Sequence, residues 1–247
     1  MNNLSKLKNL NKKNSSGMTM IEVLIALAIS SFLIIGALQI YNQSRQAFII
    51  NESIARLQET AQFALDTIEA DLRMAGSWGL LSRSTAIEGR SLLLDPNPLQ
   101  LIVPLDCGPK WPLDLLNKVN GTNNLFDLAC LPFDGAQINS DTITIRRVDN
   151  NSTAPQIGIL QIQSSRIQGQ IFSDGIVSSD FNTIDTTIHN LVVNSYYVSI
   201  NSELIPGTPS LRRKSLNNSS GMTSIVDEEI AQGIQNIQMQ LGIDLDS

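Results

Sequence analysis

The sequence is poor in the residue types that most enzymes use for catalysis and metal binding. Its 247 residues include one histidine (His189), two cysteines and only 5% aromatic residues. A single histidine excludes a site built from several histidines, and the sequence contains no glycine-rich phosphate loop. The oxygen-rich stretches at 134–141 and 149–151 lack the full ligand spacing of a calcium loop. We therefore expect no enzyme activity, no cofactor and no metal site.

Positive charge is scarce beyond the first 17 residues. The chain has 17 basic and 23 acidic residues, and four of the basic ones are lysines within residues 1–17, a leader without any acid. Removing these four lysines leaves 13 basic against 23 acidic residues, a net charge of −10. A domain this acidic has little general attraction for phosphate backbones, so nucleic-acid binding is unlikely. The only dense basic cluster is Arg212, Arg213 and Lys214, which we expect to be solvated on an exposed strand or loop.

Charge is also missing from Met18 to Leu38, with Glu22 as the single exception. A helix of this length spans about 30 Å of hydrocarbon. A secretory signal should end in small residues at alternating positions, which "IIGAL" at 34–38 matches poorly. A plain membrane anchor is long enough, but it explains neither Gly17 nor a carboxylate that costs roughly 2.5–3.5 kcal/mol at a membrane helix centre.

Cleavage after Gly17 would explain Glu22. Met18 would then carry a free, positively charged amine, and Glu22 lies four residues on, one helical turn away on the same face. The carboxylate could pair with its own amine or with the amine of a neighbouring chain in a bundle. Pairing between chains would fix their axial register, the best-attested use of a buried polar group.

The stretch "GMTMIEVLIALAISSFLIIGAL" at 17–38 resembles the class III signal of type IV pilins and type II secretion pseudopilins. The resemblance implies that prepilin peptidase cleaves between Gly17 and Met18 and methylates the new amine of Met18. It also implies that Glu22 is the family's glutamate at the fifth position of the mature chain. The family most often has phenylalanine where this sequence has Met18.

A long helix is expected from Gly17 to about Ala75, because no proline precedes Pro96 and Gly76 supplies a stop. Its second half carries an apolar stripe at spacings of three and four, which we expect to pack on a folded head. The members of the stripe are Ile50, Ile54, Leu57, Ala61, Leu65, Ile68, Leu72 and Ala75. The sequence thus predicts a leader (1–17), a transmembrane and assembly half-helix (18–40), an amphipathic half-helix (41–75) and a head (76–247).

Short alternating runs in the head predict strands at 99–105, 141–148, 158–163, 166–172 and 191–200, separated by turn-rich segments. This pattern indicates an antiparallel sheet packed on the helix, an α+β fold. His189 is expected to be a half-exposed strand residue. Residues 227–244 predict either a short helix and a strand or one amphipathic helix, and the acid pairs Glu228–Glu229 and Asp66–Glu69 are interpreted as solvated helix faces.

The two cysteines, Cys107 and Cys130, are either two unpaired apolar side chains or a disulfide. An export-type N-terminus favours the disulfide, which would close a loop of about 24 residues and contribute roughly 3 kcal/mol. Prolines 104, 109, 112 and 132 surround this segment, so we expect residues 106–135 to be an irregular excursion tied down by the bridge.

Two further stretches resemble the minor pilin family PilW. One is "RLQETAQFALDTIEADLRMAG" at 56–76, ending in the phrase Asp71 to Gly76. The other is "EEIAQGIQNIQMQLGIDLD" at 228–246, carried by Glu229, Gly233, Gly242 and Asp244. Departures are Leu241, where the family usually has an aromatic residue, and the end at Ser247, beyond which members commonly continue.

This resemblance implies a type IV pilin-like fold and a minor pilin that primes pilus assembly or forms the fibre tip. It implies a single-pass protein of the bacterial inner membrane with a periplasmic head, later part of a surface fibre serving twitching motility, adhesion or DNA uptake. Implied partners are other minor pilins, the major pilin, prepilin peptidase, the inner-membrane assembly platform and a tip adhesin. The alternatives are a large minor pseudopilin of type II secretion, a head that binds DNA or a surface, and a membrane-anchored enzyme.

Overall fold

The computed structural model describes residues 17–90, 101, 103–104, 106–108, 110–179, 185–218, 221–240 and 242. The chain divides into two units, Met1–Ala55 and Arg56–Ser247. Residues 1–16 of the expected leader, most of the expected strand at 99–105, and Leu241 and Asp244 of the second PilW-like stretch lie outside the described residues.

The predicted long helix is present as α1 (Met20–Arg73). A turn over residues 74–76 follows it, and the φ of +75° at Gly76 is a left-handed conformation that glycine adopts without steric cost. The Gly76 N–H donates to the Arg146 carbonyl oxygen at 3.0 Å, so the turn that ends the helix is bonded directly to a strand. By length and composition α1 is apolar enough to cross a membrane.

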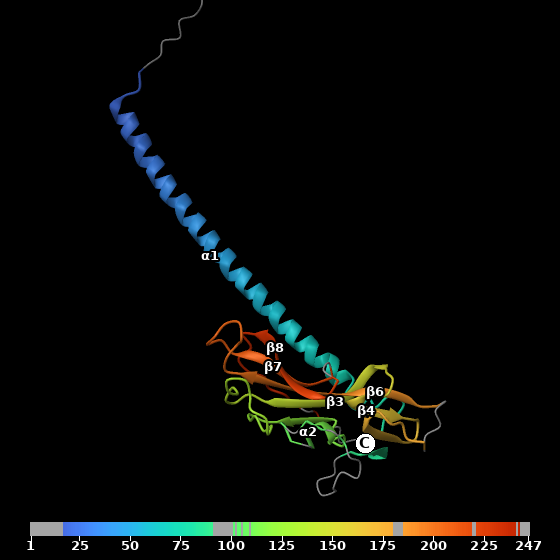
Figure 1. Ribbon diagram of the computed structural model, residues 1–247. Helices are drawn as coiled ribbons and strands as arrows, with labels where there is room; N and C mark the ends of the chain where they lie inside the picture. Colours follow the sequence, from blue (N-terminus) through green and yellow to red (C-terminus); the bar gives the residue numbers. More distant parts are fainter. Residues whose placement is uncertain are drawn as a thin grey trace, which may run out of the picture. The chain divides into compact units, whose positions relative to one another are not determined.

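The rest of the described chain forms one mostly antiparallel sheet, together with a 3-10 turn, η1 (Ser84–Ala86), and a short helix, α2 (Lys110–Leu113). The strands are β1 (Ile87–Glu88), β2 (Val119–Thr122), β3 (Thr142–Ser152), β4 (Ile157–Ser164), β5 (Gly169–Asp174), β6 (Thr187–Ser199), β7 (Ser210–Asn217) and β8 (Ser224–Gln232). Their path is β1-β5-β4-β6-β3-β2, with β7 between β6 and β8 (Figure 1). Only the β1–β5 pair among these strands is parallel. The expected α+β fold is confirmed.

Strand β6 is the centre of the sheet because it is long enough to pair with two strands along one edge. Its beginning pairs with β4, with Ser164 opposite Thr187, and its end pairs with β7, with Asn194 opposite Ser215. Its other edge pairs with β3. Four expected strands are confirmed as β3, β4, β5 and β6, whereas the helical expectation for residues 227–244 is wrong, since 227–232 are the end of β8 and 234–240 are irregular.

The two faces of the sheet have different covers, and alternation along the strands assigns each side chain to one of them. Residues 56–73 of α1 pack on the face that presents Ile143, Ile145, Tyr196 and Leu211, here called the helix face. The 106–135 segment packs through Trp111 and its neighbours on the opposite face, here called the excursion face. In Figure 1, α2 lies on the side of the strands away from the last turns of α1.

The predicted packing stripe on α1 is mostly wrong. Ala64 and Asp71 are the buried residues of the helix, with Ile68 packed beside them, whereas Leu57 and Leu65 are both 63% exposed. Of the eight predicted stripe residues, only Ile68 and Ala75 pack against the sheet core, and the contact face is completed by Ala64 and Asp71, which are not in the stripe. Helical periodicity identifies an apolar face, but it does not say whether that face meets the same chain or another one.

Candidate assembly site and the anchors of the head

The first turn of α1 is closed by one arm of a capping box, in which the Glu22 side chain accepts from the backbone N–H of Thr19. The Thr19 N–H and the Thr19 hydroxyl both donate to Glu22 Oε2, each at 2.8 Å, and the Val23 N–H donates to the Thr19 carbonyl oxygen at 3.3 Å. Glu22 is thus turned back toward the residues that precede the helix. Sequence reasoning missed Thr19, although the Thr-x-x-Glu signature at 19–22 precedes the apolar run and could have been read.

Gly17 and Met18 precede the first turn in irregular, exposed backbone. A Cβ added to Gly17 would meet no atom within 4 Å, and Met18 is 70% exposed. Of the three residues expected at the N-terminal site, Gly17 and Met18 are thus accessible chain before the helix, and Glu22 lies in its first turn, bonded to Thr19.

The first part of α1 presents apolar side chains all round. Every large apolar residue from Met20 to Ile54 is more than 40% exposed within the chain, with Met20 at 85% and Phe32 at 81%. An apolar surface of this extent needs lipid or other helices to cover it.

Asp71 is the anchor that attaches α1 to the sheet, and it is only 5% exposed. Its Oδ1 accepts from Arg147 Nε at 2.9 Å and lies 2.9 Å from Arg147 Nη2. Its Oδ2 accepts from Asn194 Nδ2 at 2.5 Å and from the Tyr196 hydroxyl at 2.6 Å. Burial, and then the hydrogen bond to this carboxylate, raise the pKa of Tyr196. The acid of the PilW-like phrase is therefore a structural link from the helix to β3 and β6.

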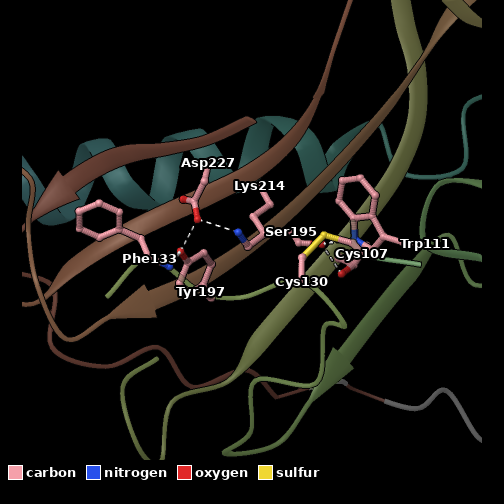
Figure 2. Close-up of a disulfide and its surroundings, with 9 residues drawn as sticks. Cys107, Trp111, Cys130, Phe133, Ser195, Tyr197, Lys214 and Asp227 are labelled. Carbon is pink, nitrogen blue, oxygen red and sulfur yellow. Dashed lines mark hydrogen bonds and ion pairs between the residues drawn. A yellow bond between two sulfur atoms is a disulfide. The ribbon is translucent and has the colours of Figure 1, made fainter. Parts of the chain in front are cut away.

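The expected disulfide between Cys107 and Cys130 is confirmed. Beside it, Trp111 Nε1 donates to Ser195 Oγ at 2.8 Å and the Trp111 carbonyl oxygen accepts from Arg146 Nε at 2.8 Å, which ties α2 to β6 and β3 (Figure 2). Burial lowers the pKa of Arg146. The disulfide thus closes a segment that is also hydrogen-bonded, through Trp111, to the central strands β3 and β6 of the sheet.

The basic cluster of β7 is neither displayed nor solvated, contrary to expectation. Arg212 is 1% exposed and Lys214 is 5% exposed. Asp227 accepts from both of them, from Arg212 Nε at 2.8 Å to Oδ1 and from Lys214 Nζ at 2.7 Å to Oδ2. Figure 2 shows the bond from Lys214. On the helix face, Arg213 pairs with Glu228 at 2.6 Å. The antiparallel register places the three cations opposite the three acids of β8, so this cluster offers no open surface to a phosphate backbone.

This charge network also binds the 106–135 segment, here called the excursion, to the sheet. The Tyr197 hydroxyl accepts from the Phe133 N–H at 2.8 Å and donates to Asp227 Oδ2 at 2.6 Å, and the Arg212 guanidinium lies 3.9 Å from the centre of the Phe133 ring. Burial works against ionisation of Asp227, but the hydrogen bonds from Lys214, Tyr197 and Arg212 prevail and lower its pKa. Asp227 is therefore a charged carboxylate that is bonded to β6 and β7 directly and is linked to Phe133 of the 106–135 segment through Tyr197 and Arg212.

The other residues singled out in the sequence lie partly where they were expected and partly elsewhere. Asp66 and Glu69 are exposed on the helix, as expected, whereas Glu228 and Glu229 lie on β8 and not on a helix. His189 lies in β6 but is only 9% exposed, with Nδ1 2.9 Å from the Asp149 carbonyl oxygen, so the expected half-exposure is wrong. In the described part of the chain, no group of three or more His, Cys, Asp or Glu side chains could hold a metal ion.

A family model described as the prokaryotic N-terminal methylation motif matches residues 12–38. No curated protein matches the chain, and no solved structure does. The matched range contains Gly17, Met18 and Glu22 and the first 19 residues of α1, Met20 to Leu38. The family of this motif is structural rather than catalytic. The chain therefore has a type IV prepilin-like N-terminus, which supports a type IV pilin-like protein processed by prepilin peptidase and anchored in a membrane.

Proposed function

We propose that the protein is a minor pilin of a type IV pilus. The observation that supports this proposal most strongly is that several features occur together at the N-terminal end of the described chain. The N-terminal methylation motif coincides with the capped start of a helix whose large apolar side chains are all exposed from Met20 to Ile54, directly after an accessible Gly17–Met18 bond. A helix with this surface serves both as a membrane anchor and as an element that packs with other helices in a fibre.

In the proposed pathway, prepilin peptidase removes residues 1–17 and methylates the amine of Met18. Residues 18–40 then hold the protein in the inner membrane and later pack in the fibre, continued by the half-helix 41–75, while the head 76–247 lies in the periplasm. Glu22 accepts from Thr19 within its own chain, so its carboxylate already points to the turn where the new amine arises. Pairing of that carboxylate with the amine of a neighbouring subunit sets the register of assembly.

The PilW-type assignment within this class rests on Asp71 and on the head. Asp71, the acid of the Asp-Leu-Arg-Met-Ala-Gly phrase, bonds the helix to the sheet. This contact gives a physical reason for an acid at that position of the phrase. The disulfide suits the oxidising periplasm. The proposed partners are other minor pilins, the major pilin, the assembly platform and a tip adhesin, and the proposed role is to prime assembly or to form the fibre tip.

The first test is the mass of the N-terminal peptide from membrane-extracted protein, in cells with and without prepilin peptidase. We expect a chain that begins at N-methylated Met18 only when the peptidase is present. Gly17→Val should keep the leader, and Gly36→Val is its matched control, because a Cβ at either glycine meets no atom within 4 Å. A wild-type chain that retains Met1 in both strains would contradict the proposal and leave a plain anchor.

A second test separates the two roles of Glu22. Gln at this position still accepts the capping hydrogen bonds but carries no charge. Glu22→Gln should therefore be cleaved and folded normally, yet fail to enter fibres. Normal incorporation of this variant would exclude charge pairing as the register device. Gene deletion, scored for surface fibres and twitching against secreted enzymes, distinguishes a pilus subunit from a type II secretion pseudopilin.

A further inference from the structure

A cavity of about 760 Å³ opens on the head beside the last residues of β8. Its walls come from α1, from the turn after β6 and from β8, all within the second unit. Two of its apolar side chains are strongly exposed, Phe63 at 57% and Leu204 at 78%. An apolar floor of this kind is available to an anchoring side chain from outside.

The cavity runs along the open edge of a strand. Among the described strands β8 pairs with β7 alone, which leaves its other edge without a neighbouring strand. Four consecutive residues, Glu229 to Gln232, line the cavity. Because successive side chains of a strand point to opposite faces, four in a row share one cavity only where that cavity follows the backbone edge. A register shift at this point pairs Leu211 with Ala231 and Arg212 with Glu229, so Ile230 has no residue opposite it.

The charge around this edge has one sign. Glu59, Asp66, Glu203 and Glu229 line the cavity, and no lysine or arginine is among the described residues that do so. Arg212 lies close to two of these acids, with Nη1 3.6 Å from Glu229 and Nη2 3.8 Å from Glu203. Glu59 and Asp66 on α1 are exposed and form no ion pair with this arginine. The negative charge along this edge therefore favours a positively charged partner.

We propose that this groove, defined by its cavity-lining residues and the free edge of β8, is a docking site for an extended basic segment of a partner polypeptide. The segment adds a strand to β8, places an apolar side chain against Phe63 and Leu204, and sets lysine or arginine beside Glu59 and Asp66. A second copy of β8 does not suit this edge, because β8 carries no lysine or arginine to place beside Glu59 and Asp66. Nucleic acid is excluded by the same carboxylates.

This site goes beyond the proposed function and does not depend on it. The test uses the full-length protein in detergent and a fluorescent, acetylated eight-residue peptide of alternating lysine and valine, followed by anisotropy. We expect binding that weakens as salt rises, and no binding of the matching glutamate–valine peptide. Absence of lysine–valine binding at low salt would overturn the proposal.

Two variations decide between strand addition at this groove and general attraction to an acidic protein. Methylating the peptide's backbone nitrogens one at a time should weaken binding at every second position, because only alternate N–H groups of an added strand face β8. Glu59→Gln with Asp66→Asn should weaken binding about tenfold, roughly 1.4 kcal/mol. The control pair Asp127→Asn with Asp185→Asn changes the net charge equally at exposed positions outside the groove and should leave binding unchanged. Equal losses in both pairs, or no two-residue period, would overturn the site.

Discussion

The two faces of the head sheet are fastened in opposite ways. On the helix face, α1 is held by one carboxylate, Asp71, which collects bonds from three residues of β3 and β6. On the excursion face, the hold is divided among a disulfide, Trp111 and the network around Asp227. The comparison predicts that the docking of α1, with few apolar contacts, depends strongly on one polar residue, whereas a segment with several attachments should tolerate the loss of any one of them.

The largest effect should come from Asp71→Ala. The substitution leaves the guanidinium of Arg147, whose side chain is 18% exposed, without its carboxylate, and leaves Asn194 and Tyr196 without their acceptor. Removing one partner of a buried pair costs about 3–5 kcal/mol. We expect a loss of this size in equilibrium unfolding of the full chain in detergent.

The two faces can be followed separately in that experiment. Both tryptophans of the chain, Trp78 and Trp111, are in the core of the excursion face, so their fluorescence reports that face, while circular dichroism reports α1. Asp71→Ala should shift the dichroism transition to lower denaturant before the fluorescence transition. Asp71→Asn keeps acceptor oxygen and should cost less. Coincident, unshifted transitions in Asp71→Ala would show that the helix is not held by this carboxylate.

The next largest effect should come from replacing both cysteines by serine. The bridged residues are 23 apart in sequence, and freeing a loop of this length costs about 3 kcal/mol through the entropy of the unfolded chain. The Trp111 and Asp227 attachments remain, so the excursion should stay docked at low temperature and the tryptophan signal should stay native. Full loss of the native fluorescence in the unheated variant would show that the bridge alone holds this face.

A smaller, pH-dependent effect is expected from Asp227→Asn. The pKa of Asp227 is lower in the folded head than in an unfolded chain, so its network stabilises the head above about pH 4. That stability is lost as the pH falls through the lowered folded-state value. At neutral pH the variant should lose about 1.5–3 kcal/mol, a typical contribution of hydrogen bonds to a charged group. In a pH series of unfolding midpoints, its acid branch should be flatter than that of the wild type, and parallel branches would contradict this role.

The long helix, its stop at Gly76, four strands and the disulfide could all be predicted from local patterns. Strands β7 and β8 could not, because "LRRKSLN" and "SIVDEEIAQ" are too charged to be taken as strands one at a time. Each run is stabilised by the other across the ladder, and pairing between residues 15 apart, such as Arg213 and Glu228, leaves no periodic signal in either segment. The same long-range pairing explains why the basic cluster is buried.

The candidate site was predictable where its chemistry is local and not where it depends on tertiary contact. The roles of Gly17, Met18 and Glu22 stay predictions from local spacing and from the resemblance, within the range that the methylation motif matches, and Thr19 was readable as the start of a capping box. The role of Asp71 was not, because the same acid on an isolated helix would be solvated. Only the donors of β3 and β6 make it an anchor.

The smallest effect should come from Glu69→Gln, which sharpens the comparison from within the helix. Glu69 pairs with Arg73 on the exposed side of α1, two residues before Asp71, and both side chains are more than half exposed. Exposed pairs four residues apart contribute about 0.3–0.5 kcal/mol, and salt screens them. Glu69→Gln should therefore shift the dichroism transition only slightly at low salt and not measurably at high salt, whereas the Asp71→Ala loss should persist at both. If the two variants were equally sensitive to salt, Asp71 would behave as a surface charge. The contrast between a helix attached by one buried carboxylate and a segment attached at several points would then be wrong.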